Sequence, residues 1–282
     1  MRITILGCGY VGTALARHWR DTSDHQLRLT TTSPERRAEL AELADAVHVL
    51  EGADAEGLRA ALKDSEVAVF SLAPTGTSQV GAEGYEATYL RTFEALERVL
   101  PSLPQLRQLI YTGSCSVYGD AGGGWVDETT PPAPRDRHGE ILLASERRLQ
   151  ACADGDRRVA ILRLGAIYGP GRELAPRFRP LAGSTRAGDG ASYTGWIHRD
   201  DVVGALAWAV ASGLEGIVNL VDDEPLRVRE LVERVLTAAG LAPLRWDPGA
   251  APERSPANRR IANRRLHSLG YQLRHPRLDP DA

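Results

Sequence analysis

A glycine-rich turn near the start of the chain constrains its fold more than any other feature. Residues Arg2–Leu6 have the β-branched and aliphatic character of a buried strand, and a helical pattern begins at Val11. Between them stands Gly7-Cys8-Gly9-Tyr10-Val11-Gly12, with the spacing G-x-G-x-x-G. In such a turn Gly7 allows the tight bend, Gly9 lets a phosphate group approach the backbone, and Gly12 lets the helix pack closely on the strand. The turn, with Tyr10 and Val11 at the helix start, therefore predicts a binding site for the pyrophosphate of a dinucleotide.

Up to about residue 170, short apolar segments alternate with longer helical ones, a pattern typical of a parallel sheet with helices on both faces. We expect strands at Arg2–Leu6, Gln26–Thr31, Ala46–Leu50, Glu66–Leu72, Gln108–Gly113 and Arg158–Leu164. We expect helices at Val11–Arg20, Pro34–Leu43, Ala55–Leu62, Glu83–Leu100 and Gly139–Ala153. Six strands joined by crossover helices predict an α/β fold, a Rossmann-type doubly wound parallel sheet.

The alternation loosens after Gly169-Pro170-Gly171. Beyond it we expect a helix at Asp200–Ala211, a strand at Gly216–Val221 and a helix at Val228–Ala239, followed by a basic tail. The pattern predicts a dinucleotide-binding domain at residues 1–170 and a smaller C-terminal substrate lobe at residues 171–282, interleaved with the first.

Composition narrows the possible partners and the location. A net charge of −3 gives no general attraction to nucleic acid or to anionic membranes, so neither is expected as a partner. The first residues include no apolar stretch as long as a signal peptide or a membrane span, so a cytoplasmic location is expected. The three cysteines are widely separated and lack metal-ligand spacing, so no metal site is expected.

The segment after the second expected strand bears on the choice between NAD(H) and NADP(H). In an NAD site, an acidic residue about twenty residues after the glycines usually holds the ribose hydroxyls. Here that place falls within Thr30–Arg37. The hydroxyls of Thr32 and Ser33 and the guanidinium groups of Arg36 and Arg37 can donate to a 2′-phosphate, which favours NADP(H), with NAD(H) as the alternative cofactor. The alternative is that Glu35 turns inward and that the two arginines are solvated helix charges.

Five segments together resemble the extended short-chain dehydrogenase/reductases, the family of sugar-nucleotide epimerases and dehydratases. They are the glycine turn, Ser71-Leu72-Ala73-Pro74, Tyr111–Gly119, Leu162–Gly171 and Trp196–Val202. The resemblance implies further cofactor contacts at Ser71, Leu72, Ala73, Pro74, Thr112, Gly113 and Gly165. The tail, with Asn258–Ile261 and Leu269–Tyr271, is similar to that of a bacterial subgroup usually called atypical.

The chain departs from this family where the chemistry is usually performed. In typical members a Ser or Thr orients the substrate oxygen, a Tyr is the general acid and base, and a Lys four residues later lowers the pKa of the Tyr. Ser114 matches the hydroxyl position, but His138 stands where the Tyr belongs and Leu142 where the Lys belongs. The only lysine of the chain, Lys63, has no Tyr four residues before it. The standard Tyr/Lys mechanism is therefore excluded.

Three residues are candidates for the missing chemistry. His138 can donate or accept a proton near neutral pH without a lysine to activate it, although a solvated histidine at a helix start would look the same. Ser114 is a candidate for orienting the substrate, or simply for capping its strand. Tyr118, and less directly Tyr168, lie in segments near the family's cleft, and the alternative for both is a structural tyrosine.

We therefore expect an NADP-dependent oxidoreductase or epimerase/dehydratase-like enzyme with an altered proton relay. The alternative is a non-catalytic NADP(H)-binding sensor or regulatory protein, which would also keep the glycine turn while losing the Tyr and Lys. A small-molecule substrate is expected, anionic or sugar-like, because a basic excess in the tail could hold its phosphate or carboxylate; a solvated charged helix face is the alternative. This excess comprises Arg254, Arg259, Arg260, Arg264, Arg265, Arg274 and Arg277. The resemblance also implies a homodimer formed through the helices Glu83–Leu100 and Gly139–Ala153.

Overall fold

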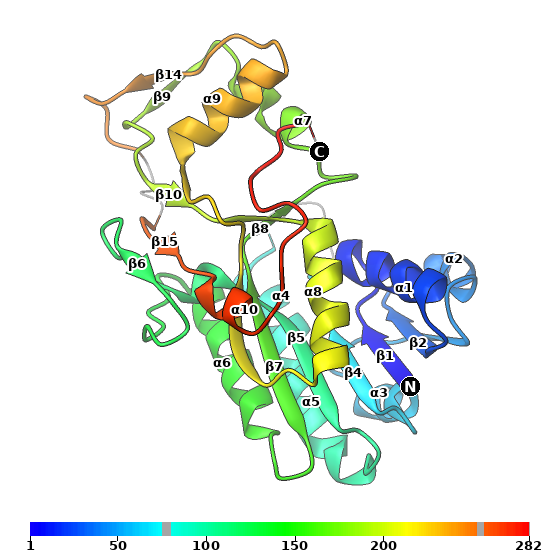
Figure 1. Cartoon of the computed structure of the whole chain (residues 1–282). Helices are drawn as coiled ribbons and strands as arrows, with labels where there is room; N and C mark the ends of the chain where they lie inside the picture. Colours follow the sequence, from blue (N-terminus) through cyan, green and yellow to red (C-terminus); the bar gives the residue numbers. More distant parts are fainter. Residues whose placement is uncertain (75–79, 253–256, 282) are drawn as a thin grey trace. The chain divides into compact units, whose positions relative to one another are not determined.

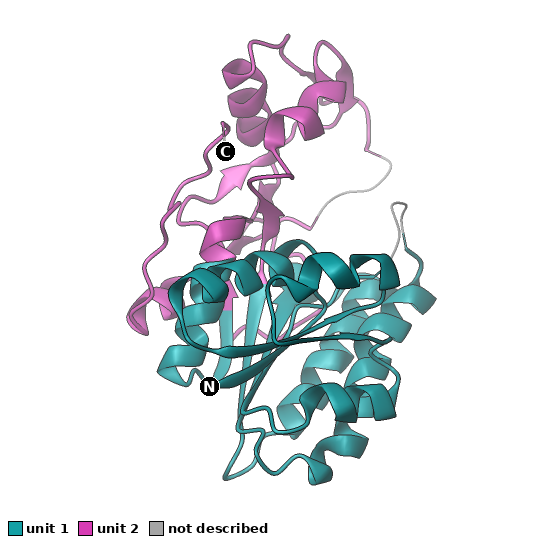
Figure 2. Ribbon diagram, turned by 90° about the vertical axis from the view of Figure 1, so that its right-hand side faces the viewer, with its two compact units in different colours: residues 1–117, 134–163, 203–218 teal, residues 118–133, 164–202, 219–282 magenta. Residues whose placement is uncertain are grey.

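The computed structural model describes residues 1–74, 80–252 and 257–281, which divide into two compact units (Figure 2). Unit 1 comprises residues 1–117, 134–163 and 203–218, and unit 2 comprises residues 118–133, 164–202 and 219–282. Each unit is therefore assembled from three separate stretches of chain. Within the described residues, no helix is both long and apolar enough to cross a membrane.

Unit 1 is built on a seven-stranded sheet with the order β12-β7-β5-β4-β1-β2-β3 (Figure 1). Its strands are β1 (Arg2–Leu6), β2 (Gln26–Thr31), β3 (Ala46–Val49), β4 (Val67–Phe70), β5 (Gln108–Ser114), β7 (Arg158–Leu164) and β12 (Gly216–Leu220). The four pairings from β3 to β5 are parallel. The strand order reverses between β1 and β4, the place where doubly wound sheets bind ligands. The predicted α/β class is confirmed.

Helices connect these strands. They are α1 (Tyr10–Thr22), α2 (Arg37–Ala41), α3 (Ala55–Leu62), α4 (Ala82–Tyr85), α5 (Arg91–Val99), α6 (Arg137–Ala151) and α8 (Arg199–Ser212). Helices α3 and α5 are in contact, as are α5 and α6. Their apolar sides pack with Phe70 and Tyr111 of the sheet, and Phe93 and Leu96 of α5 are fully buried. Each such side chain contributes about 1.5–3 kcal/mol by leaving water.

Two differences from the sequence-based expectation matter for the site. The strand assigned to the substrate lobe, residues 216–221, is instead the edge strand β12 of the unit 1 sheet, because its last three residues, Val218–Leu220, are apolar or buried against it. The helix expected at Glu83–Leu100 is interrupted by one π-helical turn at Glu86–Leu90. Such turns break the regular register of an α-helix and are frequent at functional sites.

Unit 2 consists of short strands and helices. The strands are β6 (Trp125–Val126), β8 (Ala166–Tyr168), β9 (Thr185–Ala187), β10 (Tyr193–Thr194), β11 (Trp196–His198), β13 (Leu226–Arg227), β14 (Arg245–Asp247) and β15 (Arg260–Ile261). The helices are α7 (Leu174–Phe178), α9 (Val228–Ala238) and α10 (Arg264–Ser268). A small core gathers Tyr168, Leu174, Trp196, Leu231 and Val235.

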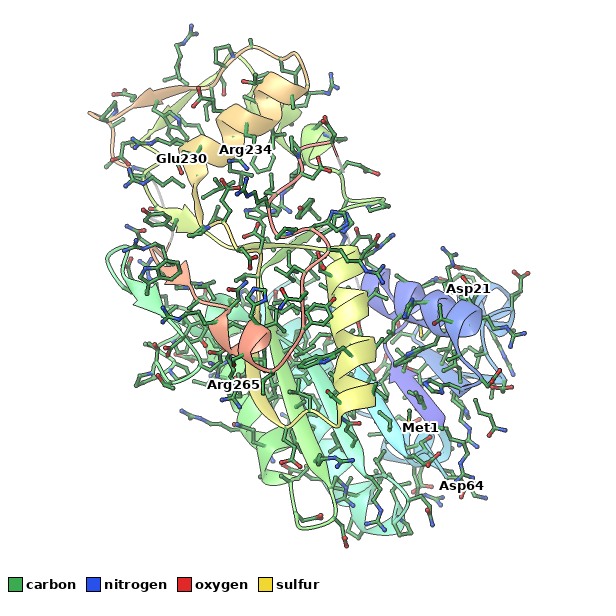
Figure 3. The ribbon with its side chains drawn as sticks, in the orientation of Figure 1. Met1, Asp21, Asp64, Glu230, Arg234 and Arg265 are labelled. Carbon is green, nitrogen blue, oxygen red and sulfur yellow. The ribbon has the colours of Figure 1, made fainter. Side chains whose placement is uncertain are left out.

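Polar contacts fix the segments of unit 2 that have little regular structure. Arg234 of α9, labelled in Figure 3, pairs with both carboxylate oxygens of Glu224, at 2.7 and 2.9 Å. The fully buried carboxylate of Asp201 accepts the backbone N–H groups of Arg274 and His275. Burial and the neighbouring charges of Glu224 and Asp223 raise the pKa of Asp222 to about 8. This carboxyl group is therefore mostly protonated at neutral pH.

Candidate active site

The glycine turn joins β1 to α1 in unit 1, and its geometry explains each glycine. Gly7 has a φ of +89°, and a Cβ there would lie 2.5 Å from the carbonyl oxygen of Ser71. A Cβ on Gly12 would lie 2.4 Å from the carbonyl oxygen of Gly7, whereas a Cβ on Gly9 would meet no atom within 4 Å. Gly7 and Gly12 are thus required by packing, and Gly9 leaves open space above the backbone.

The start of α1 faces that open space. Gly9 is the N-cap residue and offers no side-chain cap, and Val11 is buried beneath the turn. The first N–H groups of a helix lack partners within the helix and carry partial positive charge. An uncapped start of a 13-residue helix, with no Cβ at Gly9, fits the pyrophosphate of a dinucleotide.

The two arginines predicted to bind a 2′-phosphate lie in different places. The guanidinium of Arg36 donates to the carbonyl oxygen of Cys8 and, at 3.2 Å, to the hydroxyl of Thr13, so it lies against the glycine turn. Arg37 is exposed, and its charge acts on His48 of β3, whose pKa is lowered by burial and then by Arg28 and Arg37. Of the pair, Arg36 is therefore the one placed beside the predicted cofactor.

The hydroxyl residues at the end of β2 complete this corner. Thr30 accepts the N–H of Gly7 on its Oγ1 at 3.0 Å, and Thr31 accepts the N–H of Ser33 at 3.1 Å. Thr32 is exposed and Ser33 is half-buried. Ser33 precedes Pro34 at the first position of a 3₁₀ turn, but its side chain makes no capping hydrogen bond. The side chains of Thr32 and Ser33 are therefore not consumed by capping.

The carboxyl ends of β4 and β5 form the next part of the site. The N–H of Ser71 donates to the carbonyl oxygen of Leu6, which holds the Ser71–Pro74 turn against the end of β1. Thr112 donates its hydroxyl to the carbonyl oxygen of Phe70 at 3.2 Å. A Cβ on Gly113 would lie 2.9 Å from Oε1 of Glu146, so α6 approaches β5 closely here.

Helix α6 is fixed at this point by a buried ion pair. Glu146 and Arg163 have side chains only 1% and 2% exposed, and Nη2 of Arg163 lies 2.7 Å from Oε2 of Glu146. Nε of Arg163 donates to both carboxylate oxygens of Glu146 at 3.2 Å. Removing one partner of such a pair leaves an uncompensated buried charge, at a typical cost of about 3–5 kcal/mol.

A cavity of about 340 Å³ opens in unit 1 beside the ends of β5 and α6. Its lining comprises Tyr85, Tyr89, Thr112, Gly113, Ser114, Ser116, Asp136, His138 and Leu142. The structure thus brings Ser114 and His138, both predicted from the sequence, to the same cavity. Neither lysine nor arginine occurs among these lining residues.

The hydrogen bonds of Ser114 and His138 define what each can donate. The Oγ of Ser114 accepts the N–H of Ser116 at 3.1 Å, so its own proton remains for another acceptor. Nε2 of His138 lies 3.1 Å from the carbonyl oxygen of Val80, and a carbonyl oxygen only accepts. Nε2 therefore carries a proton, and Nδ1 is the atom with which a neutral His138 can accept one.

Sequence reasoning missed several residues of this cavity, among them Tyr85 and Tyr89. They lie on α4 and the π-helical turn that follows it, and the ring centroids of Tyr85 and His138 are 4.3 Å apart. Asp136 is the N-cap of α6 and accepts the N–H of Gly139 at 2.9 Å. Two tyrosines four residues apart in the helix that follows β4 were the available signal, because that spacing puts both on one side of a helix.

The remaining predicted residues lie in unit 2. Tyr118 is 1% exposed and donates to Oδ1 of Asn219 at 2.9 Å, and the hydroxyl of buried Tyr168 accepts the N–H of Asp279. Both arrangements are typical of structural tyrosines. A Cβ on Gly165 would lie 2.8 Å from the carbonyl oxygen of Gly195, which explains glycine there by packing.

The basic tail was predicted as a possible anion site. Arg254 lies outside the described residues, and the other six arginines are in unit 2. The guanidinium of Arg260 lies over the rings of Trp125 and Tyr193, at 5.0 and 5.2 Å from their centroids, and its Nε donates to the carbonyl oxygen of Gly123. Arg260 is thus held by cation–π contacts within unit 2.

Three potential metal ligands in unit 2, His198, Asp200 and His275, have ligand atoms within 4.8 Å of one another. The rings of His198 and His275 are stacked, with centroids 3.7 Å and planes 31° apart, and Nδ1 of His198 accepts the N–H of Asp200. A metal lies in the plane of the imidazole that binds it, so stacked rings do not converge on one ion. Burial, followed by the neighbouring His275, lowers the pKa of His198.

Comparison with known proteins identifies the family. The model of the NAD dependent epimerase/dehydratase family matches residues 3–220, which include the glycine turn, the Ser114 strand and α6. The chain belongs to this family. Membership confirms the resemblance drawn from the sequence motifs and the assignment of a NAD(P)-binding Rossmann fold.

Comparisons with individual proteins extend this result. Protein YeeZ of Escherichia coli strain K12 is 33% identical over 214 residues, covering 73% of this chain and 71% of YeeZ. The 3-diazoavenalumate denitrifying reductase of a Streptomyces species is 28% identical over 188 residues, covering 60% of this chain and 62% of the reductase. The structure of MoeE5 in complex with UDP-glucose and NAD has a TM-score of 0.77 at 23% identity, covering 97% and 94% of the two chains. This last likeness shows a shared fold.

Proposed function

We propose that this member of the family is an NADP(H)-dependent oxidoreductase or epimerase/dehydratase-like enzyme with a rebuilt proton relay. The observation that carries the proposal is the cavity that joins Ser114 and His138 at the carboxyl end of β5. The two side chains differ in chemistry, come from different elements, β5 and α6, and line one cavity at the carboxyl end of β5.

The residues of unit 1 fit the cofactor. The open space at Gly9 and the uncapped start of α1 suit a pyrophosphate, and Arg36 beside the turn suits a 2′-phosphate. Thr32 and Ser33 would add hydroxyl donors to the 2′-phosphate. Ser71–Pro74, Thr112 and Gly113 would contact the nicotinamide half of the cofactor. The cofactor contacts predicted for Arg37 and Gly165 stay predictions. So does the division into a cofactor domain at residues 1–170 and a substrate lobe at residues 171–282.

The side chains of the cavity suggest how the reaction proceeds. The bound cofactor supplies or accepts a hydride. Ser114 would donate a hydrogen bond from its O–H to the oxygen of a carbonyl or alcohol and hold the reacting carbon in place. His138, with Nε2–H bound to Val80, would move the exchanged proton through Nδ1.

The lining of the cavity also bears on the substrate. Hydroxyls, aromatic rings, one imidazole and one carboxylate surround it, with no lysine or arginine among the lining residues. An uncharged carbonyl group therefore suits this part of the site better than a phosphate or carboxylate. A reductase among the relatives supports reduction as the direction of reaction.

A non-catalytic NADP(H) sensor is the second candidate, favoured by one observation. Leu142, at the family's lysine position, is 6% exposed and lines the cavity, so nothing at that position replaces the lysine charge.

Calorimetric titration of cofactor-stripped protein with NADPH, then NADH, followed by NADPH oxidation against a carbonyl panel, tests both candidates. Preference for NADPH with turnover that falls in His138→Ala and Ser114→Ala supports the enzyme. Binding without turnover supports the sensor, and binding of neither cofactor contradicts both.

A further inference from the structure

The cavity contains a phenol that the family's motif does not account for. Tyr85 is half-buried, lines the cavity with Ser114 and His138, and its hydroxyl has no hydrogen-bond partner within the described part of the chain. A hydroxyl that faces a cavity and lacks an internal partner is available to donate to a ligand.

The neighbouring tyrosines differ from Tyr85 in this respect. Tyr89 is 9% exposed, and burial followed by the proximity of Tyr85 raises its pKa well above the usual value. Tyr111 is fully buried in the core, is absent from the cavity lining, and burial raises its pKa further. Of these three phenols, Tyr85 is therefore the one best placed to exchange a proton with a bound molecule.

The backbone that follows Tyr85 is irregular at the cavity. Tyr85 ends α4, and the π-helical turn Glu86–Leu90 follows at once. Regular α-helix resumes only at Arg91. The irregular turn thus lies at the cavity, where a π-helical turn most often serves a site.

The contact with His138 supplies what a phenol needs in order to release its proton. The ring centroids of Tyr85 and His138 are 4.3 Å apart, and the angle between the ring planes is 51°. His138 lies in the first turn of the 15-residue helix α6. A protonated imidazole and the positive end of a helix dipole both favour a phenolate beside them. In typical members of the family a lysine on α6 has this electrostatic role, and Leu142 cannot perform it.

We propose that Tyr85 is the group that protonates the substrate oxygen. This phenol lies on α4 and replaces the tyrosine that typical members of the family have on α6. His138 is its electrostatic and proton-exchange partner. This assignment rests on the proposed function.

In the reducing direction a hydride from the reduced cofactor adds to the carbonyl carbon, and the C=O π pair moves onto oxygen. The Tyr85 O–H bond breaks, and its proton forms the new alcohol O–H. The phenolate then regains a proton through solvent in the cavity from the imidazolium form of His138, which is recharged by solvent, so charge and atoms balance.

The test begins with cofactor-free protein labelled with ¹³Cζ-tyrosine. The Tyr85 resonance, assigned by its loss in Tyr85→Phe, should move across the pH range in which imidazoles titrate. This movement should disappear in His138→Gln and persist in Tyr111→Phe. If the Tyr85 resonance moves with pH in the same way in His138→Gln as in the wild type, the proposed pairing is overturned.

The second arm measures NADPH oxidation with 4-nitrobenzaldehyde, an uncharged aromatic carbonyl. Tyr85→Phe should lower kcat by about 100-fold or more, the usual share of a general acid, with the calorimetric affinity for NADPH unchanged. The control Tyr111→Phe should keep kcat within about 3-fold, because its hydroxyl lies outside the cavity. Full turnover in Tyr85→Phe overturns the assignment of Tyr85, whereas wild-type protein that binds no NADPH overturns the proposed function instead. If the wild type does not reduce this aldehyde, the resonance measurement alone decides.

Discussion

The two ends of the site in unit 1 are specified in different ways. At the glycine turn the requirement lies in the backbone, since Gly7 and Gly12 leave no room for a Cβ and Gly9 exposes a helix start. At the cavity beside β5 the requirement lies in side chains, Ser114, His138 and Tyr85, that come from three separate elements. A backbone requirement leaves a local sequence motif, whereas a constellation of side chains need not.

This difference explains how the family's chemistry can change while its cofactor site stays recognisable. A glycine turn that loses a glycine loses its shape. A proton relay needs only a group of suitable chemistry within reach of the substrate, whichever element carries it.

The largest expected effect tests the backbone end. Gly7→Val combines a positive φ with a Cβ 2.5 Å from Ser71, so we expect a loss of NADPH affinity of about 100-fold or more together with a lower Tm. Gly9→Ala is the matched control, because its Cβ meets nothing within 4 Å. It should keep the Tm and still weaken NADPH binding by about 10-fold, since the methyl group occupies the space of the phosphate. Unchanged NADPH affinity in Gly9→Ala would contradict the assignment of that space.

The next effect tests the side-chain end. His138→Ala should lower kcat for an aldehyde by about 100-fold and Ser114→Ala by about 10-fold, with NADPH affinity within about 2-fold of wild type in both. Steady-state kinetics and calorimetry on the same preparations check this. Equal losses of NADPH affinity and of turnover would mean that the two ends are not separable, and the comparison above would be broken.

A smaller effect separates Arg36, which lies against the glycine turn, from Arg37, which does not. Arg36→Ala should weaken NADPH binding by about 10-fold and leave NADH binding unchanged. A charge-assisted hydrogen bond to phosphate contributes about 1.5–3 kcal/mol, and the net effect is smaller because Arg36 also bonds to the glycine turn. Arg37→Ala, whose side chain lies toward His48, should change neither affinity. A larger loss in Arg37→Ala than in Arg36→Ala would reverse the assignment.

The smallest effect concerns unit 2 and shows whether its buried polar groups are structural rather than part of the site. Asp222 has a folded-state pKa of about 8, above the ordinary value of about 3.9 in an unfolded chain. The unfolded chain therefore loses this proton first, and the stabilising contribution of the protonated group declines as pH rises from about 4 to about 8. Asp222→Asn should remove that decline and raise the free energy of unfolding at pH 7.5 by about 1 kcal/mol, without changing NADPH affinity. Denaturant unfolding at pH 5 and pH 7.5 measures it, and a pH slope that survives the substitution contradicts the assignment.

The sequence predicted most of unit 1 because its strands are short apolar segments bounded by turns, and β1, β2 and β7 have the expected bounds. It could not show that residues 216–220 join that sheet, since a short apolar strand carries no signal of its partner. The spacing of Tyr85 and Tyr89 indicated a shared helix face, but it could not show that this face lines the cavity with His138, because no motif links α4 to α6 along the chain. His138 and Ser114 were found because each occupies a position that a motif defines, and their meeting at one cavity needed the fold.

The buried pair of Glu146 and Arg163 carries a consequence for how such an enzyme evolves. It anchors α6 two helical turns beyond His138 and one turn beyond Leu142, so the hold on the helix is independent of the residues that face the cavity. The first turns of α6 can therefore accept new side chains while the scaffold keeps its place, and one catalytic solution can be exchanged for another through two substitutions. His138→Tyr with Leu142→Lys would place the tyrosine and lysine typical of the family on a helix that the ion pair holds independently of both.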